Sequence, residues 1–216
     1  MSGYDFYTGT GAAGMAQATA LLEAHHHGTL LLWNQEANQP EQTFMHYAWR
    51  PEPELVMIEG HLANTNPMLK ALAENPQATF MVSGPSAYVP SHWSSGNLAV
   101  PTSYYSWVQA RVDVRLISDA DGIIGILERM LERLQPEGEH PQMRTEPSRW
   151  KAMLGAITGL EMRVTGLRSR FKYGQNRPVD FRMGIHDRLI ARGQGQDAAV
   201  AQAVLAHLPP DQEAGK

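Results

Sequence analysis

Residues 103–117 read SYYSWVQARVDVRLI, and this stretch decides the fold class. Apolar and polar side chains alternate along it, with Val108 and Val112 on one side and Gln109, Arg111 and Asp113 on the other. Successive side chains of a β-strand point to opposite faces, so a period of two indicates a strand with one face on a core. The stretch therefore predicts one long strand.

Shorter apolar runs precede this strand and are separated by turn sequences. Asn38-Gln39-Pro40 and Arg50-Pro51-Glu52-Pro53 are typical of turns, because Pro and Asn interrupt regular backbone hydrogen bonding. A short helix is predicted to begin at Asn66-Pro67 and to end at Asn75-Pro76. The predicted strands are 29–34, 43–49, 54–59 and 78–82, and a helix is predicted before them at 12–24.

The chain after the long strand is predicted to be mostly helical. Ser118-Asp119-Ala120-Asp121 supplies N-capping side chains for a helix over 122–134 whose apolar residues share one face. The further predicted elements are a helix at 147–156, a strand at 159–171, and helices at 179–191 and 197–208. We expect a single domain over 1–208, with peripheral helices and a helical C-terminus, and a disordered tail over 209–216.

The order of these elements favours an antiparallel α+β barrel. Strands follow one another as a meander, and regular alternation of strand and helix, which would indicate a doubly wound parallel sheet, is absent from the pattern. The 43% apolar content of the 216 residues is ample for the core of such a barrel.

Composition excludes several classes of site. The chain has no cysteine, which excludes disulfides, thiolate metal sites and a cysteine nucleophile. The sequence shows no apolar run near the roughly 20 residues that cross a bilayer, and its start lacks the pattern of a signal peptide. We therefore expect a cytoplasmic protein without a membrane partner. The run His25-His26-His27 is a candidate for metal binding. Adjacent residues at a helix end point in different directions, however, so no metal site is predicted.

Positive charge is concentrated in the last third of the chain, although the formal net charge is −4. Between residues 163 and 192, only Asp180 and Asp187 oppose eight cationic side chains: Arg163, Arg168, Arg170, Lys172, Arg177, Arg182, Arg188 and Arg192. This pattern is typical either of an anion-binding region or of an ordinary solvated basic face.

Three stretches carry residues suited to a ligand. Residues 60–67 read GHLANTNP, residues 84–93 read GPSAYVPSHW and are followed by VPT at 100–102, and residues 172–177 read KYGQNR. They resemble, in this order, the G-H-x-A-x-x-N-P, G-P-x-A-Y-I-S-x-x-W with V-P-T-W-N-Y, and K-x-S-Q-N-R signatures of the PaiB family. That family comprises FMN-binding split-barrel proteins, relatives of pyridoxamine 5′-phosphate oxidase, described as negative transcriptional regulators. The likeness runs from about Leu21 to Arg192.

The resemblance implies an FMN-binding split β-barrel, mostly antiparallel and Greek-key-like, and a homodimer with FMN as cofactor. An FMN site needs cations and N–H donors for the phosphate and a flat apolar wall for the ring. The expected cofactor-binding residues are His61, Asn64, Thr65, Asn66, Trp93, Tyr105, Arg111, Lys172, Gln175, Asn176 and Arg177. The alternative for the Asn residues is that they satisfy the backbone of a turn and a helix cap, and aromatic residues at alternate strand positions are also typical of a core or a subunit interface.

Two departures from the family pattern are visible. The strand-to-helix turn, Asn64-Thr65-Asn66, lacks the basic residues of the related oxidases, and Gly174 stands where the family has serine. Three functions stay open: a flavin-dependent oxidoreductase, a negative transcriptional regulator with FMN as ligand, and a split barrel that binds haem through His61 or His92 or holds no cofactor. The sequence shows no nucleophile with an adjacent base, so no catalytic residue is predicted.

Nucleic acid stays possible as a partner, although the net charge gives it no support. A dimer is expected, with a contribution from the apolar face formed by Val200, Val204, Leu205 and Leu208.

Overall fold

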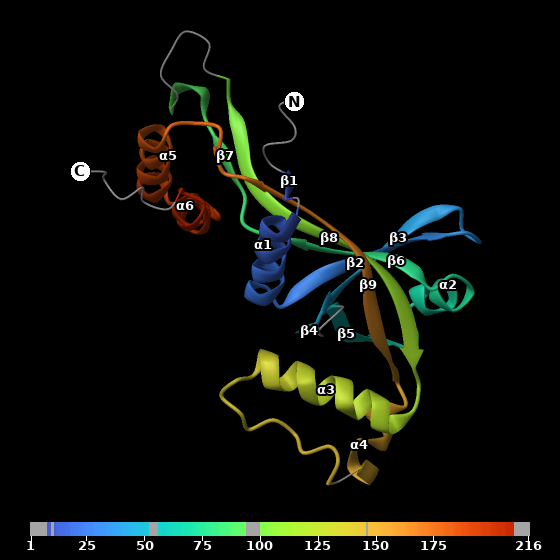
Figure 1. Cartoon of the computed structure of the whole chain (residues 1–216). Helices are drawn as coiled ribbons and strands as arrows, with labels where there is room; N and C mark the ends of the chain where they lie inside the picture. The colour runs from blue at the N-terminus through green and yellow to red at the C-terminus, as the bar shows by residue number, and fades with distance from the viewer. Residues whose placement is uncertain (1–7, 10, 52–55, 94–99, 146, 210–216) are drawn as a thin grey trace. The chain divides into compact units, whose positions relative to one another are not determined.

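The computed structural model describes residues 8–9, 11–51, 56–93, 100–145 and 147–209 (Figure 1). These residues form two compact units. The barrel unit comprises residues 18–82 and 108–167, and the helical unit comprises the described residues of 1–17, 83–107 and 168–216. The predicted tail, apart from its first residue, lies outside the described part of the chain, and the single domain over 1–208 stays a prediction.

The sheet contains strands close to the predicted places, but they do not follow one another as the predicted meander. Its strands are β2 (His27–Asn34), β3 (Gln39–His46), β4 (Ala48–Pro51), β5 (Val56–Ala63), β6 (Gln77–Ser83), β8 (Thr102–Ile117) and β9 (Ile157–Lys172), in the spatial order β3-β2-β6-β8-β9-β5-β4. The pairings of β2 with β3 and β6, and of β5 with β4 and β9, are antiparallel. The architecture is therefore the α+β split barrel that the sequence predicts, and the path from β3 to β4 is open.

The opening falls at Tyr47, between β3 and β4. The predicted strand over 43–49 is thus wrong as a single element: β3 pairs with β2, whereas β4 pairs with β5 at the other end of the path. Gly60 on β5 lies against β3, where a Cβ atom would be 3.1 Å from the carbonyl oxygen of His46. The last residues of β3 thus approach the backbone of β5 closely, and the absence of a side chain at Gly60 leaves room for this approach.

The long strand β8 has the alternation that its sequence predicts. Val108, Ala110, Val112 and Val114 are buried on the barrel side, and the residues between them are half-buried or exposed. The alternation ends at Ile117, which is buried although it lies out of phase. Ile117 belongs to a cluster of apolar side chains under the helix that follows, so packing against this helix decides its position.

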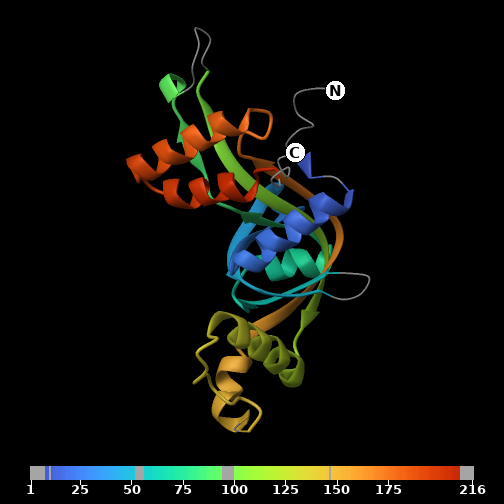
Figure 2. The same cartoon turned by 60° about the vertical axis from the view of Figure 1, so that its left-hand side comes forward.

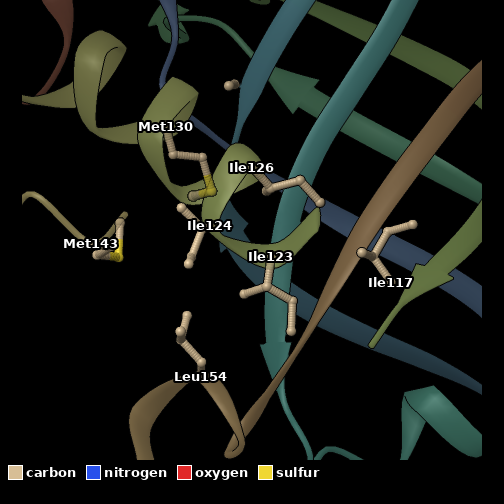
Figure 3. Packing of buried hydrophobic residues seen from close by; sticks show 8 residues of the cluster. Ile117, Ile123, Ile124, Ile126, Met130, Met143 and Leu154 are labelled. Atoms are coloured by element: carbon tan, nitrogen blue, oxygen red, sulfur yellow. The ribbon is translucent and has the colours of Figure 1, made fainter. Parts of the chain in front are cut away.

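The helix α3 (Ala120–Leu134) begins at the predicted cap, where Asp119 Oδ1 accepts a hydrogen bond of 2.7 Å from the Gly122 N–H. Its buried residues Ile123, Ile124, Ile126 and Met130 pack with residues of the strand before it and of the segment after it, as Figure 3 shows: Ile117, Met143 and Leu154. The segment ends with α4 (Pro147–Leu154). The barrel unit thus has a second, smaller core beside the barrel.

Two side chains, Tyr47 and Arg133, donate hydrogen bonds to the carbonyls at the end of the helix α1 (Gly11–Ala24). The Tyr47 hydroxyl donates to the Leu22 carbonyl at 2.7 Å, and Arg133 of α3 donates to the carbonyls of Leu22, Glu23 and His25 at 2.8 to 3.0 Å. These carbonyls lack partners within a helix, so the cation of Arg133 serves as the cap. Burial raises the pKa of Tyr47, so the hydroxyl stays protonated.

The helical unit contains short strands and two packed helices. The strands β1 (Thr8–Gly9) and β7 (Ala87–Val89), which the sequence analysis missed, pair with β9 and β8. A 3-10 turn, η2, covers Ser91–Trp93, and α5 (Val179–Arg192) lies beside α6 (Asp197–Ala206), as both views show (Figures 1 and 2). Among the described helices, none has the length and apolar character needed to span a bilayer.

The packing of α6 corrects one expectation. Val200 and Val204 were expected on an apolar face available to a second subunit, but both are fully buried within the unit. Leu205 and Leu208 are half-buried. The apolar face of α6 is therefore used inside the chain and gives no support to a dimer.

Candidate functional site

The turn between β5 and α2 (Met68–Glu74) carries three of the expected residues. The Asn64 side chain donates to the Gly155 carbonyl at 2.9 Å and accepts from the Thr158 hydroxyl at 2.7 Å. Asn66 Oδ1 accepts from the Met68 N–H at 3.0 Å, and its amide nitrogen donates to Thr43 Oγ1 at 3.0 Å. Both side-chain amides are thus hydrogen-bonded within the chain, in line with the alternative that these Asn residues serve the turn and the helix cap. Thr65 is exposed beside them.

His61 lies three residues before this turn, on β5. Its Nδ1 atom is buried and has no hydrogen-bond partner among the described residues. Burial lowers the pKa of His61, and the nearby His46 lowers that pKa further. The ring is therefore neutral at pH 7 and does not supply a cation for a phosphate.

A pocket in the helical unit brings together three other expected residues, Lys172, Asn176 and Arg177. It has a volume of about 300 Å³, within the roughly 300–1,000 Å³ range of small-molecule sites. Its wall also contains Val89, Val100, Pro101, Thr102, Tyr104, Gly174 and Phe181. The pocket therefore combines two cations and an amide with two aromatic rings, and none of the described residues that line it carries a carboxylate.

The two cations of this pocket are held in different ways. Lys172 Nζ donates to Thr102 Oγ1 at 2.7 Å, and its pKa is lowered by partial burial and by the charge of Arg170. The Arg177 guanidinium lies over the Phe181 ring, 5.6 Å from the ring centroid. An anion in the pocket would offset the charge of both side chains and would raise the pKa of Lys172 again.

The surroundings of Gly174 explain why glycine stands here where the family has serine. Its φ is +76°, and a Cβ atom at this position would collide with the hydroxyl of buried Tyr104. Gln175 stabilises the same turn, because its side chain accepts from the Tyr173 N–H at 2.8 Å and donates to the Phe171 carbonyl at 2.7 Å. Gly174 and Gln175 thus shape the loop that presents Asn176 and Arg177.

The two expected aromatic residues lie outside the wall of this pocket. Tyr105 is half-buried, and Lys172 Nζ lies 5.9 Å from the centroid of its ring. The Trp93 ring is covered on one side by the Arg192 guanidinium, whose Cζ is 4.6 Å from the centroid. The aromatic residues that do line the pocket, Tyr104 and Phe181, were missed as ligand residues, because their contact with Lys172 and Arg177 depends on distant segments meeting.

Arg111, the remaining expected residue, lines a different groove in the barrel unit. This groove has a volume of about 360 Å³ and is lined by Leu31, Leu32, Trp33, Asn75, Gln77, Ala78, Thr79, Arg111, Val112, Asp113 and Thr165. Most of the expected residues thus fall into three groups: the β5–α2 turn with His61, the pocket of the helical unit, and this groove. The remaining three, Trp93, Tyr105 and Gln175, line neither the pocket nor the groove.

The basic stretch over 163–192 is largely engaged with neighbouring groups. Arg163 pairs with Asp113 at 2.7 Å, and Arg192 pairs with Asp197 at 2.6 Å. Arg182 is buried and donates to the Val204 carbonyl at 3.2 Å. The cations of the stretch therefore do not form one continuous set free of partners, although Lys172 and Arg177 line the same pocket.

The donor set fits a flavin mononucleotide. A phosphate dianion requires cations and N–H donors, which Lys172, Arg177 and Asn176 supply, and the flavin ring requires flat apolar surface, which Tyr104 and Phe181 supply. The described residues show no group of His, Asp or Glu arranged to hold a metal ion. The fold and these residues define a flavin-binding split-barrel protein.

The chain belongs to the family described as "Putative FMN-binding domain", which matches residues 12–166, and FMN is its cofactor. The match includes the whole barrel unit except residue 167 and ends before Lys172. A curated relative, "Protease synthase and sporulation protein PAI 2" of Bacillus subtilis (strain 168), is 25% identical over 156 residues, which are 71% of this chain and 74% of the relative. The expected membership of the PaiB family is thereby confirmed.

Solved structures share the fold. The FAD and heme binding protein of Mycobacterium smegmatis aligns with a TM-score of 0.58 and 16% identity, over 82% of this chain and 78% of that protein. The flavocytochrome Anf3 of Azotobacter vinelandii aligns with a TM-score of 0.57 and 17% identity, over 81% of this chain and 73% of that protein. At these identities the likeness shows the split-barrel fold alone.

Proposed function

We propose that this chain is a flavin-dependent redox protein in which Lys172 and Arg177 hold the phosphate of FMN. The observation that carries the proposal is the convergence of both cations and Asn176 with Tyr104 and Phe181 around one pocket, whose wall has no carboxylate in the part of the chain that the structure describes. FMN, when bound, supplies the electron-transfer chemistry. The chain's own residues bind the phosphate, orient the cofactor and cover the ring.

Each cation has a distinct role in this proposal. The guanidinium of Arg177 offers a planar fork to two phosphate oxygens, whereas Lys172 offers a point charge whose position is fixed by Thr102. Charge-assisted hydrogen bonds of this kind contribute about 1.5–3 kcal/mol each. In this proposal the clamp consists of Lys172, Asn176 and Arg177, and Trp93 and Tyr105 of the same unit would add contacts to the rest of the cofactor.

The test is a titration of the apo protein with FMN and with riboflavin, followed by flavin fluorescence. Wild type should bind FMN at least tenfold more tightly than riboflavin, which lacks the phosphate. Lys172→Gln and Arg177→Gln should each weaken FMN binding about tenfold or more and leave riboflavin binding unchanged. Arg168→Gln is the matched control, because Arg168 is exposed on β9 and does not line the pocket. Equal affinity of wild type for the two flavins would refute the clamp.

The redox function needs a separate measurement. The FMN complex should be reduced under anaerobic conditions by a nicotinamide or dithionite donor and should reoxidise reversibly, as loss and return of the flavin absorbance. A complex that binds FMN but cannot be reduced would leave a flavin-binding protein and remove the redox proposal.

A negative transcriptional regulator with FMN as ligand is the second candidate. The resemblance to the PaiB family and the curated relative, which is named a sporulation protein, support it, together with the basic stretch over 163–192. DNA binding through this stretch should weaken steeply as salt rises from low to moderate concentration. A mobility-shift assay on genomic fragments that shows no shift at low salt would exclude it.

Haem is the third candidate, because two proteins of the same fold are a heme binding protein and a flavocytochrome. His61, with its unpartnered Nδ1, and exposed His92 are the candidate ligands. Haem added to the protein should then give a Soret band that His61→Ala abolishes.

A homodimer is likewise proposed from the family resemblance, and light scattering should give twice the chain mass of 23.9 kDa.

A further inference from the structure

The groove of the barrel unit contains a cation without a partner. Arg111 lies on β8 with its guanidinium exposed at the groove, and no hydrogen bond or ion pair reaches this guanidinium from the described residues. Its neighbours differ: Arg115 donates to Glu161 at 2.8 Å from Nε, and Arg163 pairs with Asp113 at 2.7 Å. Arg111 is therefore available to an anion from outside the chain.

The position of this guanidinium is prepared by a glycine. A Cβ atom at Gly166 of β9 would lie 2.7 Å from Arg111 Nη2, 2.8 Å from Nε and 3.1 Å from Cζ. The guanidinium thus packs on the β9 backbone, where any larger residue would displace it. Since the side chain is already held at one place, less conformational entropy is lost when a ligand binds.

The remaining wall decides the chemical class of the ligand. Trp33, which is 50% exposed, and Leu31 supply apolar surface, and Thr79 and Thr165 supply hydroxyls. Asp113 also lines the groove, and its charge is paired with Arg163. Among the described residues of the wall, Arg111 is then the one cation that an incoming ligand meets, and a single guanidinium would not neutralise a dianion. A monoanion with two equivalent oxygens matches the guanidinium fork better, and a flat ring matches the exposed tryptophan.

We propose that this groove binds a small aromatic monocarboxylate through Arg111 and Trp33. The site is distinct from the proposed FMN clamp, because Lys172, Asn176 and Arg177 do not line it. Its volume of about 360 Å³ is sufficient for one such molecule. The carboxylate accepts from the guanidinium, and the ring lies against the apolar wall.

Benzoate is the probe for the experiment, with benzamide as its neutral counterpart, and binding to the full chain is measured by calorimetry. Benzoate should bind at least tenfold more tightly than benzamide. Arg111→Gln and Gly166→Ala should each weaken benzoate at least tenfold, and Trp33→Ala should weaken it severalfold. Gly166→Ala should keep the thermal stability of wild type, because the atoms that must move are at the end of a flexible side chain.

Arg115→Gln is the matched control, since Arg115 is exposed on the same strand four residues on and does not line the groove. It should bind benzoate like wild type. Wild-type benzoate affinity in Arg111→Gln, or equal losses in Arg111→Gln and Arg115→Gln, would overturn the proposal. Competition between FMN and benzoate would also overturn the proposal, because the groove would then belong to the cofactor. If only the Lys172 and Arg177 variants bind FMN like wild type, the FMN clamp is refuted and the benzoate site is not.

Discussion

The carboxylate of Glu59 on β5 accepts two hydrogen bonds from the Arg129 guanidinium on α3, at 2.6 Å from Nε and 2.9 Å from Nη2. The Glu59 side chain is fully buried, and the Arg50 guanidinium lies 3.7 Å from one of its oxygens. This pair joins the helix to the outer side of the barrel strand. The interaction also raises the pKa of Arg129, chiefly through the hydrogen bond to Glu59, so the guanidinium stays charged.

Removal of Arg129 should destabilise the barrel unit strongly. Arg129→Ala leaves a buried carboxylate with only the more distant Arg50, and breaking a buried ion pair in this way costs about 3 kcal/mol or more. Arg144→Ala is the control. Arg144 lies in the segment after α3 and pairs with Glu128 of that helix at an exposed position, so its removal should cost less than about 1 kcal/mol. Urea unfolding measures both, and equal costs would contradict the prediction.

Gly174 should tolerate no side chain. Gly174→Ala places a Cβ atom against the buried Tyr104 hydroxyl in a left-handed backbone conformation, so we expect a loss of about 1–3 kcal/mol and weaker FMN binding. Gly184→Ala in α5 is the control, since nothing lies within 4 Å of its would-be Cβ and alanine favours a helix by about 1 kcal/mol. Thermal unfolding measures both variants. Wild-type stability of Gly174→Ala would contradict the prediction and show that the turn accommodates a side chain.

The stability of the fold should fall as the pH falls through 6.5, the ordinary histidine pKa. Burial lowers the pKa of His61, so below pH 6.5 the unfolded chain takes up a proton that the folded chain does not. His25 and His207 are shifted in the same direction, also mainly by burial. His61→Gln should therefore reduce, without abolishing, the difference in urea midpoint between pH 7.5 and 5.5. The exposed His92→Gln should keep the wild-type difference.

Tyr47 and Arg133 should show coupled effects, because both donate to the Leu22 carbonyl. Each single change, Tyr47→Phe or Arg133→Ala, leaves one donor on that carbonyl and should cost about 1–2 kcal/mol. The double variant leaves the carbonyl without either donor, so its cost should exceed the sum of the single costs by roughly 1 kcal/mol. Additive costs in a double-mutant cycle would show that the two donors act independently.

The sequence by itself determined the features that depend on neighbouring residues. The alternation of residues 103–117 predicts β8, and Asp119 predicts the start of α3. The Pro residues at 67 and 76 flank α2, because proline has no backbone N–H and is therefore tolerated at the start of a helix but not within it. The three motif stretches led to the PaiB family, and hence to the split barrel and FMN.

Only the tertiary structure decided which side chains meet. Asn64 and Asn66 have the chemistry of phosphate donors, yet partners far away in the sequence engage their amides. Lys172 and Phe181 share a pocket because β9 and α5 fold past Tyr104, and Arg111 is positioned by Gly166 on the adjoining strand. Local patterns fix backbone geometry residue by residue, whereas a site depends on non-local contacts whose partners no short stretch of sequence specifies.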